Sequence, residues 1–191
     1  MKIEYEATFV KVDKDEIRER LTSVGAKLIK LEFLQKRITL NLPSGHELKD
    51  GWLRVRDEGD KITLSLKVVD GDKIENQKEI SLAVDNLENT CDILQTIGCV
   101  KKSCQETKRE LWKINDVEIT IDEWPFLEPF VEIEGPSEQA VKVVAGELGF
   151  EWSNAKFCAV GTLYAEKYAI AEDKINNQIP KIVFKMENPF V

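Results

Sequence analysis

Apolar and polar residues alternate in segment after segment of this chain. In "IEYEATFV", residues 3–10, every second residue is apolar, and the positions between them are Glu4, Glu6 and Thr8. A period of two is typical of a β-strand that packs one face and leaves the other face polar. The same period recurs in "LRVR" (53–56), "KITLSLKV" (61–68), "KEISL" (78–82), "VEITID" (117–122) and "FVEIE" (130–134). The sequence therefore predicts a sheet of amphipathic strands.

Few helices interrupt this pattern. Asp13 can cap a helix that ends at Gly25, and further helices are predicted over 85–98, 136–149 and 157–170. Seven or eight strands with so few helices between them indicate an α+β chain built on an antiparallel sheet or barrel. Because no linker or repeat divides the chain, we expect one domain over 1–170 and a short carboxy-terminal extension over 171–191.

Composition excludes several classes of function. The net charge of −8 and the pI near 4.9 argue against general attraction to nucleic acid or to an anionic membrane. No apolar stretch is long enough to span a bilayer, and the amino terminus does not have the layout of a secretory signal, so we expect a cytoplasmic protein. The four cysteines form no CxxC pair and there is a single histidine, so neither a zinc site nor a disulfide framework is expected.

The polar faces of the predicted strands are sorted by charge. Glu4 and Glu6 share one strand, a second pair of glutamates lies at 132 and 134, and Arg54 and Arg56 share another strand. One interpretation is an ordinary antiparallel sheet with one solvated face. The alternative is a closed barrel with its apolar faces outward under the helices and a charged lumen. Because buried charges are costly without partners, such a lumen would need a ligand: divalent cations for the acids and a polyanion for the bases.

The order of these charged strands resembles the CYTH superfamily, the triphosphate tunnel metalloenzymes. The family pattern begins with an E-x-E-x-K strand, where this chain has Glu4, Glu6 and Thr8. The pattern continues with an R-x-R strand, a lysine after the next turn, a glutamate strand and a K-x-R strand. It ends with an aspartate before an F-x-E-x-E strand. These correspond to Arg54, Arg56, Lys67, Glu79, Arg109, Asp122, Glu132 and Glu134. Lys156, near the last helix of the tunnel domain, is a looser counterpart of a basic residue that members often carry there.

The resemblance implies a closed eight-stranded antiparallel tunnel with helices packed outside. It implies that Mg²⁺ or Mn²⁺ binds to Glu4, Glu6, Asp122, Glu132 and Glu134, and that a triphosphate-containing small molecule binds to the basic residues. Lys67, Arg109 and Glu79 would take part in catalysis, with Arg54, Arg56 and Lys156 as further substrate contacts. The expected activity is metal-dependent triphosphate hydrolysis. A class IV adenylate cyclase and a triphosphate- or polyphosphate-binding module with little turnover are the alternatives.

Two positions depart from the family pattern. Thr8 stands where a lysine ends the first strand motif, and Thr107 stands where a lysine begins the K-x-R motif. Lys108 is adjacent, but strand alternation points it toward the other face of the sheet. Arg37, on the polar face of its own strand, is a candidate to replace one lost cation in binding the substrate.

Overall fold

The first strand of the protein joins the two edges of its sheet. In the computed structural model, which describes residues 1–191, β1 (Lys2–Ile3) and β2 (Tyr5–Val10) form one extended segment that is interrupted at Glu4. β1 pairs with β6 (Gln77–Val84), and β2 pairs with β9 (Phe130–Gly135), both in antiparallel orientation. The segment changes partner at Glu4, whose amide donates a hydrogen bond of 2.9 Å to the carbonyl of Gln77.

The other strands complete an antiparallel barrel. Its order is β1-β6-β5-β4-β3-β7-β8-β9-β2, where β3 is Lys27–Asn41, β4 Gly51–Asp57, β5 Ile62–Val69, β7 Val100–Ile114 and β8 Val117–Glu123. The prediction of a closed antiparallel barrel with helices outside is confirmed, although the path holds nine strands rather than eight. The extra strand arises because the interruption at Glu4 divides the first strand in two.

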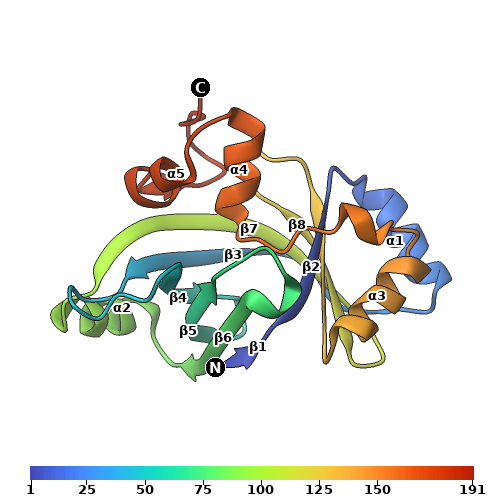
Figure 1. The fold of residues 1–191 in the computed structure, drawn as a ribbon, viewed down its shortest axis with the longest axis horizontal. Coiled ribbons are helices and arrows are strands. Elements are labelled where there is room, and N and C mark those ends of the chain that lie inside the picture. The colour runs from blue at the N-terminus through green and yellow to red at the C-terminus, as the bar shows by residue number, and fades with distance from the viewer.

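Two helices cover the apolar outer face of β2, β8 and β9. α1 (Lys14–Ser23) begins at Asp13, whose side chain accepts hydrogen bonds from two backbone amides, and α3 (Glu138–Glu147) begins at Ser137. The two helices lie side by side at one end of the molecule (Figure 1). Their buried residues join the largest core cluster, which includes Ala7, Phe9, Ile17, Leu21, Ile119, Ile121, Val131, Ile133, Val141 and Val144. The apolar face of each strand therefore points out of the barrel and its polar face points inward.

A third helix covers another part of the barrel. α2 (Leu87–Thr96) is capped by Asn86 and packs Cys91 and Leu94 against Leu40 and Val55 of the sheet. None of the helices is long and apolar enough to cross a lipid bilayer.

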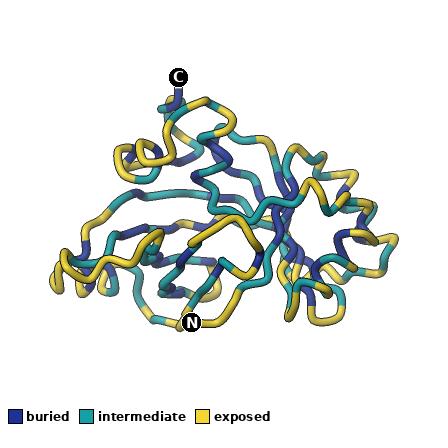
Figure 2. The backbone as a smooth tube through the Cα atoms, in the orientation of Figure 1, coloured by how far each residue is buried: buried dark blue, intermediate teal, exposed yellow.

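The carboxy-terminal segment packs as a separate layer against the barrel. α4 (Val160–Tyr168) is followed by α5 (Glu172–Gln178) and by β10 (Lys181–Ile182), which pairs in parallel with β7. Phe190 stacks on Tyr164 and Tyr168 with ring centroids 4.5 and 5.0 Å apart. Figure 2 shows buried backbone where this layer meets the strands and exposed backbone around its outer turns.

Candidate active site

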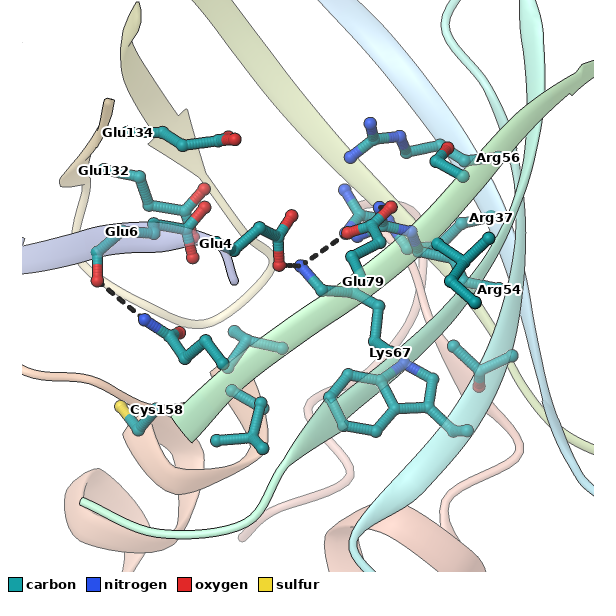
Figure 3. A pocket seen from close by; sticks show the side chains of 18 of the residues that line it. Glu4, Glu6, Arg37, Arg54, Arg56, Lys67, Glu79, Glu132, Glu134 and Cys158 are labelled. Atoms are coloured by element: carbon teal, nitrogen blue, oxygen red, sulfur yellow. Dashed lines mark hydrogen bonds and ion pairs between the residues drawn. The ribbon is translucent and has the colours of Figure 1, made fainter. Parts of the chain in front are cut away.

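A cavity of about 730 Å³, hereafter the tunnel cavity, is walled by the inward-facing charged side chains of the barrel (Figure 3). Strand alternation places them there, because Arg54 and Arg56 point inward while Leu53 and Val55 lie on the opposite face. Ten charged residues predicted from the sequence line it: Glu4, Glu6, Arg37, Arg54, Arg56, Lys67, Glu79, Arg109, Glu132 and Glu134. The wall is nearly balanced in charge, so the separation of the two signs within it is its main electrostatic feature.

The acidic wall is formed by the first and last strands of the barrel. Glu6 lies directly opposite Glu134 in the β2–β9 pairing, and Glu132 lies opposite Thr8. Burial, reinforced by the charge of Glu132, raises the pKa of Glu6 well above its usual range. Burial also raises the pKa of Glu134, and it raises that of Glu4 to about 7. The carboxylates therefore crowd one another with too little positive charge beside them.

The basic wall faces this acidic wall across the cavity (Figure 3). Arg37 lies opposite Arg56 in the β3–β4 pairing, and Arg54 is two residues before Arg56. Burial, followed by the charges of Arg56 and Arg54, lowers the pKa of Arg37 well below its usual range. Burial and the neighbouring Arg54 lower the pKa of Arg56 to about 10. Because arginine keeps its charge in proteins, these shifts mean that the cluster would be stabilised by a bound anion.

Two guanidinium nitrogens in this wall have no hydrogen-bond partner. The Nε atoms of Arg37 and Arg54 are buried, since the residues are only 6% and 9% exposed, yet neither atom donates a hydrogen bond. Arg54 has one ion pair, from its Nη2 to Oε1 of Glu79 at 3.3 Å, and Arg37 has none. Buried donors of this kind are normally satisfied, so the basic wall has free capacity for acceptor atoms of a ligand.

Lys67 joins the two walls. Its Nζ lies 2.8 Å from Oε2 of Glu4 and 3.1 Å from Oε2 of Glu79. Burial and the charge of Arg54 oppose its protonation, but Glu4 and the other carboxylates around it raise the pKa of Lys67 above its usual value. The ammonium therefore stays charged at the centre of the cavity.

Arg109 is held by a carboxylate that lies behind it. Asp122 accepts hydrogen bonds of 2.8 and 2.7 Å from Nε and Nη2 of Arg109, and another of 2.7 Å from the hydroxyl of Thr120. Glu132 binds the same guanidinium from the cavity side. Asp122 is fully buried and does not line the cavity, so the structure does not bring this predicted metal ligand to the acidic wall.

Lys156 also lies outside the cavity. Its Nζ is 2.8 Å from both carboxylate oxygens of Glu166 on α4, and its backbone pairs with Thr8. The predicted substrate contact is therefore an ion pair outside the cavity lining in this structure. The ion pair with Glu166 holds the Lys156 ammonium at α4, away from the cavity.

Some cavity residues were not predicted from the sequence. Trp52, Gln105 and Trp124 line the tunnel cavity. A signal was present, because Trp52 is in phase with Arg54, Gln105 with Arg109, and Trp124 with Asp122 along their strands. Once the period of a strand is known, it identifies the uncharged residues that line the interior as well as the charged ones.

A smaller cavity of about 360 Å³ adjoins the tunnel cavity and shares Glu6, Arg56, Arg109, Glu132 and Glu134 with it. Two ion pairs line this second cavity. Nη2 of Arg56 lies 2.7 Å from Glu58, and Nζ of Lys30 lies 2.6 Å from Asp60. The tunnel cavity therefore adjoins a smaller cavity whose lining contains paired charges.

The acidic wall fits a hard divalent cation. Glu6 and Glu134 have no ion-pair partner, whereas Glu4 is bound by Lys67 and Glu132 by Arg109. Mg²⁺ and Mn²⁺ prefer carboxylate oxygens, and Mg²⁺ commonly completes its coordination with water and phosphate oxygens. The structure gathers no three acidic, cysteine or histidine side chains into a ready ligand set. Glu4, Glu6, Glu132 and Glu134 could therefore hold a cation together with ligands from outside the protein.

Residues 2–154 match the sequence model of the CYTH domain family. A protein of Methanocaldococcus jannaschii, provisionally named an adenylate cyclase, is 29% identical over 123 residues, which cover 64% of this chain and 70% of that protein.

Two examples illustrate the solved structures that share the fold. One, from Vibrio parahaemolyticus and also provisionally named an adenylate cyclase, has a TM-score of 0.74 at 11% identity and covers 86% of this chain and 98% of that one. The other, from Hippeastrum, is a provisionally named adenylyl cyclase described as having a dominant triphosphatase activity. It has a TM-score of 0.54 at 13% identity and covers 88% of this chain and 97% of that one.

Proposed function

This chain belongs to the CYTH domain family, and we propose that it is a divalent-metal-dependent phosphohydrolase whose substrate carries a triphosphate. The observation that supports this proposal most directly is the opposition of an acidic and a basic wall across one cavity. A triphosphate with its metal ion is a ligand that needs both walls, because its oxygens suit arginine forks and its cation suits carboxylates.

The basic wall would bind and orient the phosphate oxygens. Arg37 and Arg54 have unbonded Nε atoms, and burial and the charge of Arg54 lower the pKa of Arg56 to about 10 although Glu58 pairs with it. Arg109 is fixed by Asp122 and Glu132, so it would offer a donor whose orientation does not change when the substrate binds. Phosphoryl transfer depends mainly on positioning and on charge neutralisation, and this wall supplies both.

Lys67 and Glu79 would act where the two walls meet. The Lys67 ammonium is held between Glu4 and Glu79, within reach of both the acidic and the basic side. It would neutralise charge that develops on the transferred phosphoryl group, and Glu79 would keep it in place. A cation held by Glu4, Glu6, Glu132 and Glu134 would neutralise phosphate charge in the same way.

A class IV adenylate cyclase is the second candidate, and it is supported by the name of the Methanocaldococcus jannaschii relative. The two reactions differ in the attacking group, which is water in hydrolysis and the ribose 3′-hydroxyl in cyclisation. The Hippeastrum protein, named as a cyclase but described by its triphosphatase activity, illustrates that a cyclase name in this fold does not exclude hydrolysis. We therefore place hydrolysis first.

A binding module with little turnover is the third candidate. It is supported by Thr8 and Thr107, which stand where the family pattern has lysines. A site with fewer cations should stabilise the transition state less.

One incubation series separates the three candidates. The protein is mixed with ATP, thiamine triphosphate or inorganic triphosphate in the presence of Mg²⁺ or Mn²⁺. Phosphate and cyclic AMP are then measured, together with binding by calorimetry. Metal-dependent phosphate release supports the phosphohydrolase, cyclic AMP supports the cyclase, and binding without product supports the binding module. No binding of any triphosphate would contradict all three.

A further inference from the structure

Arg37 is the only arginine lining the tunnel cavity that has no carboxylate partner, so other contacts must set its orientation. Its Nη2 donates hydrogen bonds to Oε1 of Gln35, at 2.9 Å, and to the hydroxyl of Thr107. The Thr107 hydroxyl donates in turn to the same oxygen of Gln35, at 3.3 Å. These bonds hold one nitrogen of the guanidinium, while its buried Nε donates no hydrogen bond.

The indole of Trp124 supports the face of the same guanidinium. The central carbon of the guanidinium lies over this ring, 4.5 Å from its centroid. Trp124 lines the tunnel cavity and yet is only 4% exposed. A guanidinium over an indole is attracted to the face of the ring and stacks on it. Because the hydrogen bonds fix Nη2 and the ring supports the face, the guanidinium of Arg37 is oriented before a ligand binds.

Trp124 is itself fixed by the carboxy-terminal layer. Its ring meets that of Tyr164 on α4 edge to face, with centroids 6.4 Å apart. The Tyr164 hydroxyl donates a hydrogen bond of 2.7 Å to the carbonyl of Pro125, and Phe190 stacks on the Tyr164 ring. A row of packed aromatic rings therefore runs from the end of the chain to Arg37. Both α4 and Phe190 lie outside residues 2–154, the part of the chain that matches the family model.

We propose that Trp124 is a positioning residue for Arg37, and that the carboxy-terminal layer acts on the tunnel cavity through it. An arginine that moves freely must be immobilised when it binds an anion, and this loss of entropy weakens binding. A guanidinium that is already oriented avoids the loss. The inference rests on the proposed function, because it assumes that Arg37 binds an oxygen of the triphosphate.

The first test removes the ring. Affinity for inorganic triphosphate with Mg²⁺ is measured by calorimetry at a temperature well below the Tm of every variant. Trp124→Leu should bind about 2- to 10-fold more weakly, the scale of ordering one long side chain at a binding site. Trp124→Phe keeps an aromatic face and should lose less than about twofold. Phe190→Ala changes no residue of the cavity lining, and it should weaken binding in the same direction as Trp124→Leu.

A double-mutant cycle with Arg37 separates positioning from a purely structural role. In the Arg37→Ala background, Trp124→Leu should change affinity by less than about 1.5-fold, because no guanidinium remains to be oriented. An indole that only fills the core would weaken binding equally in both backgrounds. Trp112→Leu is the matched control, since Trp112 is an indole of 8% exposure outside the cavity lining. It should lower the Tm and leave the affinity unchanged.

Hydrogen exchange of the wild type tests the same coupling from the other direction. If the carboxy-terminal layer orients Arg37 for the ligand, saturating inorganic triphosphate should slow exchange in α4 by at least about twofold, because coupling between two sites is reciprocal. The slowing should be lost in Trp124→Leu. This measurement also decides the question if Arg37→Ala binds too weakly for titration.

Three results would overturn the inference and leave the proposed function intact. They are unchanged affinity in Trp124→Leu, equal losses in the wild-type and Arg37→Ala backgrounds, and exchange in α4 that does not respond to the ligand. If the wild type does not bind inorganic triphosphate, the inference fails as well. The proposed function is contradicted only if ATP and thiamine triphosphate also fail to bind.

Discussion

Arg37 on β3 donates a hydrogen bond to the hydroxyl of Thr107 on the neighbouring strand β7. The same guanidinium donates to Gln35 at 2.9 Å and lies over the ring of Trp124, 4.5 Å from the centroid. A cation from β3 therefore lies beside the position on β7 where the family pattern has a lysine. Thr107 is small enough to leave room for the Arg37 guanidinium at this position, and its hydroxyl oxygen orients the guanidinium.

Arg37→Ala should weaken triphosphate binding by about 1.5 to 3 kcal/mol, the usual range for a hydrogen bond to a charged group. Calorimetry with the triphosphate that binds best measures the loss. Adding Thr107→Lys to Arg37→Ala should recover part of the affinity, because it returns a cation to the same space from the other strand. Thr107→Val, which removes only the hydroxyl, should cost less than Arg37→Ala. Unchanged affinity in Arg37→Ala would mean that the residue serves the fold and not the ligand.

Arg54→Ala and Arg56→Ala should each weaken triphosphate binding by about 1.5 to 3 kcal/mol without a comparable loss of stability. Each residue sits beside other guanidiniums that repel it, and this repulsion contributes to lowering the pKa of Arg56 to about 10. Removing either arginine relieves this repulsion, and the gain in stability offsets the loss of the ion pair that the arginine forms. Thermal unfolding of the ligand-free variants provides the comparison. A large drop in Tm with unchanged affinity would assign these arginines a structural role.

Asp122→Asn should destabilise the protein by about 3 kcal/mol, because it breaks the ion pair between the fully buried Asp122 and the part-buried Arg109. The metal-induced rise in Tm should persist, since the structure places Asp122 behind Arg109 and not on the acidic wall. Chemical denaturation measures the change in the free energy of unfolding, and thermal melts with and without Mn²⁺ measure the metal-induced rise in Tm. Loss of the Mn²⁺ effect in this variant alone would restore Asp122 as a metal ligand.

The metal-free protein should lose stability as the pH rises from about 4.5 to about 7. Burial raises the pKa of Glu4 from 4.5 to about 7 in the folded state. A carboxyl group whose pKa is raised in the folded state stabilises that state at pH values below its pKa in the unfolded chain. This stabilisation is lost as the pH rises through the pKa of the folded state. The pKa values of Glu6 and Glu134 are shifted in the same direction.

Millimolar Mn²⁺ should offset this loss at neutral pH, because it binds the ionised carboxylates and releases protons. Melting curves between pH 5 and 8 check both statements. The Glu4→Gln/Glu6→Gln variant should show a flatter pH profile and a smaller Mn²⁺ effect. Equal Mn²⁺ shifts in the variant and the wild type would show that the metal binds elsewhere.

Phe190→Ala should loosen the carboxy-terminal layer at a cost of about 3 kcal/mol, the usual scale for truncating a buried phenylalanine. Phe190 is 6% exposed and stacks on both Tyr164 and Tyr168, so it holds the last residues to α4. Hydrogen exchange should increase in α4 and α5 and remain unchanged in α1 and α3. Uniform destabilisation of all four helices would mean that this layer unfolds only together with the barrel.

The alternation of residues by itself determined which side chains enter the barrel. Neighbouring positions of a strand point to opposite faces, so one buried apolar residue fixes the face of every other residue in the strand. Arg54, Lys67, Glu79 and Glu132 were therefore predictable as members of one polar interior. The sorting of acids and bases onto different strands likewise indicated that a closed lumen would need divalent cations for the acids and a polyanion for the bases.

The tertiary structure decided how each inward side chain is used. Asp122 and Glu132 share the inward phase, yet only Glu132 reaches the cavity, because Arg109 covers Asp122. Lys156 has no strand periodicity to orient it, and its position depends on Glu166, ten residues away. The closure at Glu4 and the packing of α5 and β10 against β7 depend on contacts between segments far apart in the chain. A periodic pattern specifies the face of a residue, whereas depth and partners follow from register and packing between distant elements.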